Sequence, residues 1–348
     1  ERTICARLMN DRFALCLPRE EFDEKRVADS IKELQREFSG NSFHLHTYMG
    51  VYEIRDRDEA VSIMVDKANI AADTIKNNYD CCVAYYDEHL LEISIEQRRL
   101  LGEFEPALQN DEFVMYLQPQ VKRDGAAKGA EALVRWVHPS RGILTPYAFI
   151  DILENAGLIY KLDLYIWEKA AQKLAEWKEK GYGSYHISVN ISTKDFYIID
   201  IYETFTGLIN KYGIAASNLH LEITETTLMT DFEKNMNIIH KLQGVGFRVE
   251  IDDFGSGYSS LNMLKDISAD VLKIDMGFLR KSENEVKGQD ILESIITLAG
   301  KIGMDVITEG VETKKQLDML TMMGCHEFQG YYFSKPVPVS EFEEKYLV

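Results

Sequence analysis

The sequence predicts an α/β fold in which a (β/α)8, TIM-like barrel follows a partial α+β domain. Its 348 residues exceed the roughly 100–200 residues of a common single domain, which favours two domains or one barrel with an appendage. From about residue 111 onward, short apolar segments alternate with amphipathic helical segments, and eight such units are the number that closes a barrel. Before residue 88 the order is strand, helix, strand, helix, strand, which is too short for a complete enzyme.

The first 87 residues are predicted to form this partial domain. An apolar strand at 13–17 ends at Pro18, and acidic residues then open a helix that lasts to about Phe38, as the helix dipole favours. Apolar and polar residues alternate over 43–52, which indicates a strand. A second helix over about 59–77 and a strand over 82–86 complete the unit.

Residues 88–110 are predicted to form a connecting helix with a break near Pro106, because apolar residues recur among charged ones at helical spacing. This divides the chain into a partial domain at 1–87, a connecting helix at 88–110 and a barrel at 111–348. The predicted barrel strands are 113–118, 130–136, 185–190, 219–224, 248–252, 271–275, 305–309 and 327–330.

The predicted barrel helices carry apolar stripes that would cover the strands. Thr313 and Gln316 form a capping box that fixes where the seventh helix begins. One stripe consists of Ile166, Trp167, Ala170, Ala171, Leu174 and Trp177, and another of Ile291, Leu292, Ile295, Ile296, Ala299 and Ile302.

Composition limits the function classes. The formal charge of −18 argues against long nucleic acids as partners, although a small phosphorylated ligand remains compatible if metal ions supply positive charge. The five cysteines form no C-x-x-C pair and predict a reducing, cytoplasmic setting. No apolar stretch approaches the roughly 20 residues that cross a bilayer. Because the chain starts at Glu1 without a methionine, we expect a piece of a longer protein, whose missing part is a candidate for a sensor or membrane anchor.

The barrel strands alternate in a way that indicates a polar lumen. Over 248–252, Arg248, Glu250 and Asp252 alternate with Val249 and Ile251, and the strands at 185–190 and 219–224 follow the same rule. The apolar set must face the covering helices, so the polar set points inward. Burying ionisable groups costs several kcal/mol each unless they are paired or bound to metal, which favours a functional role.

Acidic and amide residues also fall at the carboxyl ends of the predicted strands, where barrel enzymes have their active sites. Their five carboxylates and one lysine leave four negative charges, which two divalent cations would offset. Oxygen ligands without cysteine favour Mg²⁺ or Mn²⁺ over zinc. The residues are Glu131, Asn190, Glu222, Asp252, Asp253, Lys273, Glu309 and Gln329.

Each of these features has an ordinary structural explanation when taken alone. A single acidic residue at a strand end is usually a helix cap or a loop residue, and the glycines of 255–257 fit a simple turn. His44 and His46 fit alternation on the solvent face of a strand better than a metal pair, and Cys81 and Cys82 have no activating neighbour. Polar residues at seven successive strand ends are harder to explain without function.

At these residues the sequence resembles the EAL family of cyclic di-GMP phosphodiesterases. Glu131-Ala132-Leu133-Val134-Arg135 matches the motif that names the family, and the resemblance covers the chain from about residue 101 to the end. One departure is Ser256, where threonine is usual. The further matching segments are 188–190, 222–225, 252–260, 273–275, 309–312 and 329–336.

The resemblance implies an antiparallel first barrel strand and a site for two Mg²⁺ or Mn²⁺ ions. Asp252 would be shared between the ions, Glu309 would be the candidate general base, and Lys273 would position or polarise the attacking water. The ligands implied for the first ion are Glu131, Asn190, Glu222 and Asp252, and those for the second are Asp252, Asp253 and Glu309.

The same resemblance implies contacts to the nucleotide and a regulatory loop. Glu225 would anchor the loop at 253–260, and the helix after it, with Leu261, Met263 and Leu264, would offer an apolar surface to a second subunit of a homodimer. The residues implied to bind cyclic di-GMP are Gln118, Leu133, Arg135, Asp275 and Gln329.

The first 87 residues resemble the second half of a GGDEF diguanylate cyclase domain. The five defining positions read Met9-Asn10-Asp11-Arg12-Phe13, so two glycines that allow backbone to approach GTP are replaced and an arginine stands for the catalytic acid. The resemblance therefore implies a degenerate domain with a regulatory or dimerising role.

Two functions are compatible with the barrel motifs. The first is hydrolysis of cyclic di-GMP to linear pGpG, and the second is a non-hydrolysing cyclic di-GMP receptor that uses the same pocket. Receptors of this kind generally lack a metal ligand, and every expected ligand type is present here. An unrelated two-metal hydrolase would require the whole motif series to be coincidence.

Overall fold

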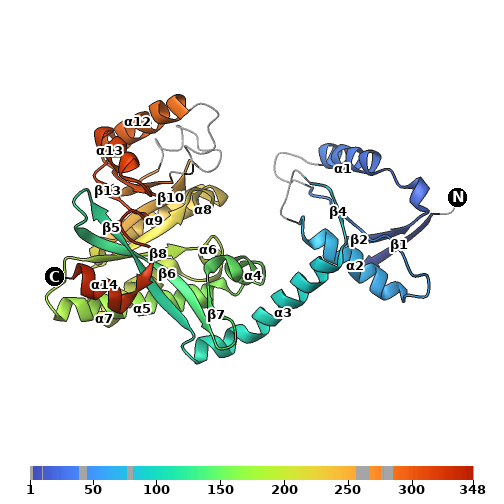
Figure 1. Cartoon of the computed structure of the whole chain (residues 1–348), viewed down its shortest axis with the longest axis horizontal. Coiled ribbons are helices and arrows are strands. Elements are labelled where there is room, and N and C mark those ends of the chain that lie inside the picture. The colour runs from blue at the N-terminus through green and yellow to red at the C-terminus, as the bar shows by residue number, and fades with distance from the viewer. Residues whose placement is uncertain are drawn as a thin grey trace. The chain divides into compact units, whose positions relative to one another are not determined.

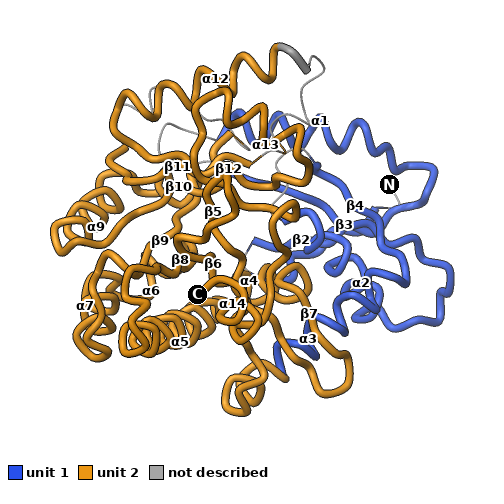
Figure 2. The backbone as a smooth tube through the Cα atoms, turned by 60° about the vertical axis from the view of Figure 1, so that its left-hand side comes forward, with its two compact units in different colours: residues 1–102 blue, residues 103–348 orange. Residues whose placement is uncertain are grey.

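The structure is a computed structural model that describes residues 3–9, 11–38, 45–76, 81–255, 267–275, 277 and 285–347 (Figure 1). The chain divides into two compact units, residues 1–102 and 103–348, which are coloured blue and orange in Figure 2. Among the described helices, none combines the length and apolar character needed to cross a bilayer.

Unit 1 contains the predicted order of strands and helices, preceded by one more strand. β1 and β2 form an antiparallel hairpin, and β3 and β4 pair in parallel. Gly50 in β3 permits the close approach of α2, since an added Cβ would lie 1.8 Å from the carbonyl oxygen of Ala68. The elements are β1 (Ile4–Met9), β2 (Arg12–Cys16), α1 (Glu24–Phe38), β3 (Met49–Val51), α2 (Val61–Asp73) and β4 (Val83–Tyr85).

Two predictions for this part of the chain need correction. The strand predicted over 43–52 is observed only as β3, and residues 43 and 44, including His44, lie outside the described residues. α3 (Glu88–Gln109) continues through Pro106, so the predicted break is wrong. Pro106 lies in the last turn, where it removes the one hydrogen bond that residue 106 would donate to the carbonyl of Gly102, while its own carbonyl accepts a 3.0 Å hydrogen bond from Asn110 N.

Eight strands of unit 2 close into a barrel. β5 is antiparallel to both of its neighbours, β6 and β13, and the other neighbouring pairs are parallel, which confirms the antiparallel first strand. In sheet order the strands are β5 (Phe113–Lys122), β13 (Glu327–Phe328), β12 (Asp305–Glu309), β11 (Val271–Asp275), β10 (Arg248–Phe254), β9 (Leu219–Thr224), β8 (His186–Ile191) and β6 (Ala127–His138).

β5 and β6 are longer than predicted because they form an antiparallel hairpin that extends beyond the barrel. Two short strands, β7 (Gly142–Leu144) and β14 (Val337–Pro338), pair with β6 and β5 respectively. These additional pairings were not predicted, because they join segments that are too short to show a strand pattern of their own.

Helices cover the outside of the barrel, with α5 packed on β8, α9 on β10 and α12 on β12. The predicted α5 stripe is buried, and the capping box of Thr313 and Gln316 is present. Ile291 in α12 and Ile302, directly after its end, are exposed, so that stripe was predicted too wide. The main helices are α4 (Ile150–Asn155), α5 (Ile159–Glu179), α6 (Asp195–Ile198), α7 (Ile201–Tyr212), α8 (Glu225–Thr230), α9 (Phe232–Val245), α12 (Glu285–Lys301), α13 (Lys314–Met322) and α14 (Val339–Tyr346).

Candidate active site

Charged side chains from opposite sides of the barrel meet in its lumen. Nζ of Lys273 on β11 lies 3.4 Å from Oε2 of Glu131 on β6, although three strands separate β11 from β6 in either direction around the barrel. Such a contact can only cross the inside of the barrel. The alternating polar residues of the strands therefore reach the lumen, as the pattern predicted.

Lys273 is the centre of a group of four carboxylates, of which Glu131 and Glu222 are buried and Asp252 and Glu309 are half-buried. Its Nζ lies 2.8 Å from oxygens of both Glu222 and Glu309, and 3.3 Å from Oδ1 of Asp252. The side chains of Lys273 and Glu222 are completely buried. With Glu131, four ionised carboxylates around one ammonium group would leave three negative charges without compensation. Buried charge of this kind is costly unless cations or protons balance it.

The pKa values show how the metal-free site relieves this repulsion. Burial raises the pKa of Glu222 well above its usual range, and the charge of Glu131 adds to the rise. Burial raises the pKa of Glu309 to about 8, with Lys273 opposing the shift and Asp252 adding to it. Burial lowers the pKa of Lys273, but the surrounding carboxylates outweigh that effect and hold it well above its usual range. A proton on Glu309 therefore offsets part of the repulsion among these carboxylates near neutral pH.

The unsatisfied oxygens of this group fit divalent cations. Both oxygens of Glu222, Oδ1 of Asp252 and Oε1 of Glu309 are buried and accept no hydrogen bond within the described part of the chain. Three of these atoms are in ion-pair contact with Lys273, without an aligned hydrogen bond. Asn190 lies beside them and donates from Nδ2 to Oε1 of Glu131 at 3.2 Å. A set of carboxylate and amide oxygens suits Mg²⁺ or Mn²⁺.

A bulge brings two consecutive acidic residues to the end of β10. The register between β10 and β11 shifts between Ile251 and Phe254, and Asp253 has a φ of 55°, which is uncommon for a residue with a side chain. Burial and the charges of Asp252 and Asp275 raise the pKa of Asp253. A regular strand would turn neighbouring side chains to opposite faces, whereas a bulge re-aims them. Asp252 and Asp253 can therefore serve one site.

Not every candidate stands at the end of its strand, and this corrects the sequence analysis. Glu131 lies well inside β6, although the parallel pairing of β6 with β8 ends at this residue. Leu133 and Arg135 follow on the same face of β6, up to roughly 13 Å farther along the strand. The guanidinium of Arg135 lies 5.5 Å from the centre of the Tyr116 ring. This part of the hairpin can form a wall beside the carboxylates.

Two glutamines border the carboxylate group. Nε2 of Gln329 donates to Oε2 of Glu131 at 2.5 Å and to Oε1 of Gln118 at 3.2 Å. Both glutamines are buried. Asp275 ends β11 in register with Glu309, and its Oδ1 accepts a 2.7 Å hydrogen bond from Gly277 N. Gln118, Gln329 and Asp275 thus lie next to the proposed metal ligands.

The loop predicted to carry regulation can be assessed only in part. Glu225 is half-buried in the first turn of α8, directly after the N-cap residue Thr224. Residues 256–266, which include Ser256, Leu261, Met263 and Leu264, lie outside the described residues. The anchoring role of Glu225 therefore stays a prediction.

The sequence analysis overlooked two features of the lumen. Tyr116 lies under Arg135, and its position two residues before Gln118 on β5 is the signal that could have identified it. His186, His220 and Glu250 form a second polar cluster, although each was recognised as part of the alternating inward set. Their proximity depends on how the three strands are staggered, and the alternation of residues along a single strand does not reveal that stagger.

The fold and this acidic site define a barrel with a carboxylate group suited to divalent cations at the carboxyl side of its strands. Residues 102–336 match the family model described as the EAL domain. The chain belongs to the EAL domain family.

Relatives and solved structures of this family resemble the chain over most of its length. The bifunctional diguanylate cyclase/cyclic di-GMP phosphodiesterase MucR of Pseudomonas aeruginosa is 30% identical over 97% of the chain, and the cyclic di-GMP phosphodiesterase PdeR of Escherichia coli is 33% identical over 69%. The chain spans 50% and 36% of the lengths of these two proteins.

Two solved structures support the same assignment. One, described as the PaMucR phosphodiesterase in complex with c-di-GMP, is 33% identical with a TM-score of 0.67, and the match covers 70% of this chain and 99% of that one. An EAL domain protein from Listeria monocytogenes EGD-e is 29% identical with a TM-score of 0.59, covering 71% of this chain and 97% of that one.

Proposed function

We propose that unit 2 hydrolyses cyclic di-GMP to linear pGpG. The observation that carries the proposal is the group of four carboxylates around buried Lys273, three of which, Glu222, Asp252 and Glu309, have oxygens that accept no hydrogen bond within the described residues. Relatives named as cyclic di-GMP phosphodiesterases support the choice of substrate. We also propose that the protein is cytoplasmic and that it forms a homodimer.

The proposed ligands form two overlapping sets. When bound, two Mg²⁺ or Mn²⁺ ions would offset the carboxylates, acidify a water molecule and stabilise the leaving oxygen. Asp252 belongs to both sets and lies where the bulge of β10 begins. The first set is Glu131, Asn190, Glu222 and Asp252, and the second is Asp252, Asp253 and Glu309.

Lys273 and Glu309 have the protonation behaviour that the hydrolysis step requires. The carboxylates keep Lys273 charged, so its ammonium group can orient the attacking water. Glu309, 2.8 Å from Nζ of Lys273, accepts a proton from this water. The oxygen of the water then bonds to phosphorus, and one P–O bond to ribose breaks. A carboxyl pKa near 8 is unusually high for this residue type and suits a base near neutral pH.

The substrate would lie against the wall next to these residues. Arg135 offers a guanidinium to a phosphate oxygen, and Leu133 offers an apolar contact from the same face of β6. Gln118, Gln329 and Asp275 supply polar atoms that can bind guanine or ribose. These residues lie beside Glu131 and Glu309 along the lumen.

For unit 1 we propose a degenerate, partial GGDEF-like domain without cyclase activity. Arg12 stands at the position of the catalytic acid. This position therefore offers no carboxylate for the metal ion of a bound nucleotide. The unit would act through regulation or dimerisation. Incubation of the chain with GTP and Mg²⁺ should yield no cyclic di-GMP, and product above the background of a buffer control would overturn this reading.

The experiment for unit 2 is a product assay. Purified chain is mixed with cyclic di-GMP and Mn²⁺ or Mg²⁺, and nucleotides are separated by liquid chromatography. Linear pGpG should accumulate over many turnovers, and a chelator should stop it. Binding of cyclic di-GMP without any pGpG would support the non-hydrolysing receptor instead.

A further inference from the structure

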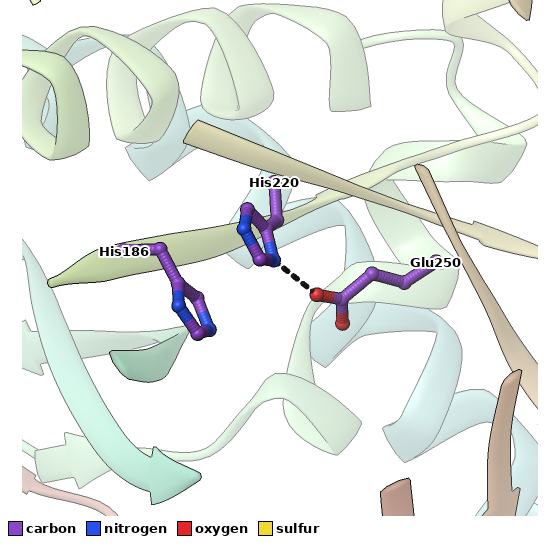
Figure 3. A group of neighbouring side chains, drawn as sticks. All are labelled: His186, His220 and Glu250. Carbon is purple, nitrogen blue, oxygen red and sulfur yellow. Dashed lines mark hydrogen bonds and ion pairs between the residues drawn. The ribbon is translucent and has the colours of Figure 1, made fainter. Parts of the chain in front are cut away.

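A second group of ionisable residues lies at the amino ends of three neighbouring barrel strands. His186 is the first residue of β8, His220 the second of β9 and Glu250 the third of β10 (Figure 3). One ring nitrogen of each histidine and one oxygen of Glu250 lie within 4.8 Å of one another. The active-site ligands Asn190, Glu222 and Asp252 follow on the same three strands, toward their carboxyl ends. The two groups are therefore distinct and are connected through the strands.

This group faces an open cavity. Its volume is about 500 Å³, and its lining includes all three residues, together with Lys128 and Arg248 at the mouth. Lys128 forms an ion pair with Glu327, and Arg248 forms one with Asp305 at 2.6 Å. These basic side chains are neutralised by their own partners. The cavity thus gives a small cation access to the histidines without a fixed excess of positive charge at its entrance.

One carboxylate oxygen of Glu250 accepts no hydrogen bond within the described residues. Its Oε1 accepts hydrogen bonds from Nδ1 of His220 at 2.6 Å and Oγ of Ser188 at 3.2 Å, while Oε2 is buried without a partner. The residue is 0% exposed. A fully buried carboxylate with one unsatisfied oxygen favours a bound cation.

The histidines are suited to donate nitrogen ligands. Their rings stack with centroids 3.8 Å apart and planes within 4°. Burial and the adjacent His220 ring hold the pKa of His186 well below its usual range, so that ring is neutral at pH 7. Oε1 of Gln120 lies 2.7 Å from Nε2 of His186 and adds a fourth donor atom at the edge of the group.

The glycine at position 129 leaves room for the His186 ring. An added Cβ on Gly129 of β6 would lie 2.4–2.5 Å from three atoms of this imidazole. Real Cβ atoms do not approach so closely, so any side chain at position 129 would displace the ring. Gly129 therefore provides a way to move His186 without removing a ligand.

From these contacts we infer that His186, His220 and Glu250 bind one transition-metal ion of the zinc class at the amino end of the barrel. Imidazole nitrogens with a carboxylate form a typical Zn²⁺ ligand set, whereas the carboxyl end offers only oxygen ligands to Mg²⁺ or Mn²⁺. The ion would link β8, β9 and β10, which carry four proposed active-site ligands: Asn190, Glu222, Asp252 and Asp253.

Binding requires a small local rearrangement. Ligand atoms about 2.1 Å from a tetrahedral ion are about 3.4 Å apart, so a group spread over 4.8 Å must contract. Stacked rings point their lone pairs in parallel, and the two histidines must tilt to share one ion. As the ion binds, the neutral His186 ring keeps its single N–H proton on the nitrogen that does not bind the ion, and any second proton on His220 is released to solvent through the cavity.

Cobalt titration of the full chain tests the inference. In a Glu131→Ala/Asp252→Ala background, which weakens the oxygen site, Co²⁺ should bind at one equivalent and give the intense visible absorption of a four-coordinate, nitrogen-ligated ion. Zn²⁺ should displace it, and Mg²⁺ in large excess should not. Absence of this spectrum at saturating Co²⁺ would show that the group is a hydrogen-bonded network filled by water.

Further variants identify the ligands. His220→Gln and Glu250→Gln should each lower Co²⁺ affinity by more than about hundredfold, and Gly129→Ala should also lower it by displacing His186. His138→Gln is the matched control, because His138 is a buried histidine paired with Glu103 at 2.9 Å outside this group. Unchanged affinity in folded His220→Gln and Glu250→Gln proteins would overturn the assignment. If these variants fail to fold, the inference is tested by comparing the Co²⁺ spectrum of the parent with that of Gly129→Ala.

Discussion

The two ends of the barrel lumen accommodate buried charge in opposite ways. At the carboxyl end, Lys273 contacts four carboxylates, and protons must remain on Glu222 and Glu309 in the metal-free protein. At the amino end, a single carboxylate, Glu250, is held by His220 and Ser188 and stays ionised. The comparison shows that the same alternation of residues can produce a charge-rich site and a nearly balanced one within one barrel.

The largest expected effect is loss of turnover at the carboxyl end. Glu131→Ala should reduce kcat by at least about 1000-fold, because a methyl group cannot replace a metal-binding carboxylate that also contacts Lys273 and Gln329. Product formation is measured by chromatography. His138→Gln, remote from the site in the fold, should keep normal turnover. Activity of Glu131→Ala within tenfold of the parent would separate the carboxylate group from catalysis.

Stability should respond more strongly at the carboxyl end than at the amino end. Lys273→Met removes the only cation in contact with the four described carboxylates and should cost about 3–5 kcal/mol in metal-free protein, because breaking a buried ion pair leaves uncompensated charge. Glu250→Gln keeps an acceptor for His220 and should cost about 1–3 kcal/mol. Urea unfolding of both variants gives the difference. Equal losses would mean that the two ends are not electrostatically different.

Metal affinity should depend on pH at the carboxyl end. The pKa of Glu309 is raised from its usual 4.5 to about 8 in the folded protein. Between these two pH values the folded protein holds a proton that the unfolded chain has released. This group therefore loses stabilising effect as pH rises from about 4.5 to 8, and an incoming ion must displace the proton. Mn²⁺ affinity should rise at least about tenfold per pH unit below pH 8, because the ion displaces the proton on Glu309 and any proton on Glu222, and the slope should become smaller above pH 8. Calorimetry that shows no pH dependence between 6 and 8 would contradict the raised pKa.

A smaller effect is expected from Glu225→Ala. If this half-buried residue anchors the loop after Asp253, turnover should fall about three- to tenfold or require more metal, because positioning is lost while every ligand remains. Kinetics are recorded across an Mn²⁺ titration, with circular dichroism as the control for folding. An unchanged metal titration would mean that the loop is held by other residues.

The sequence predicted the barrel well because its signals are local. β9, β11 and β12 begin and end at the predicted residues, and the alternation that placed their polar side chains in the lumen has a period of two. The shape of the site depends on non-local pairing instead. Glu131 lies inside a long strand because β6 forms a hairpin with β5, and Asp253 is re-aimed by a bulge against β11.

The same reasoning explains the other differences. The stacking of His186 on His220 follows from the stagger of parallel strands, which no single segment reveals. Ile291 and Ile302 are exposed because the width of a covered stripe depends on the neighbouring helices and not on spacing alone.

A single-turnover experiment tests the central claim most directly. Chain in excess over cyclic di-GMP is first saturated in the presence of a chelator, so that all nucleotide is bound, and Mn²⁺ is then added. If the carboxylates around Lys273 form a two-metal phosphodiesterase site, all bound nucleotide should appear as linear pGpG, and none should do so in Glu131→Ala. Recovery of intact cyclic di-GMP from the parent chain after Mn²⁺ addition would contradict the proposed hydrolysis and identify a receptor.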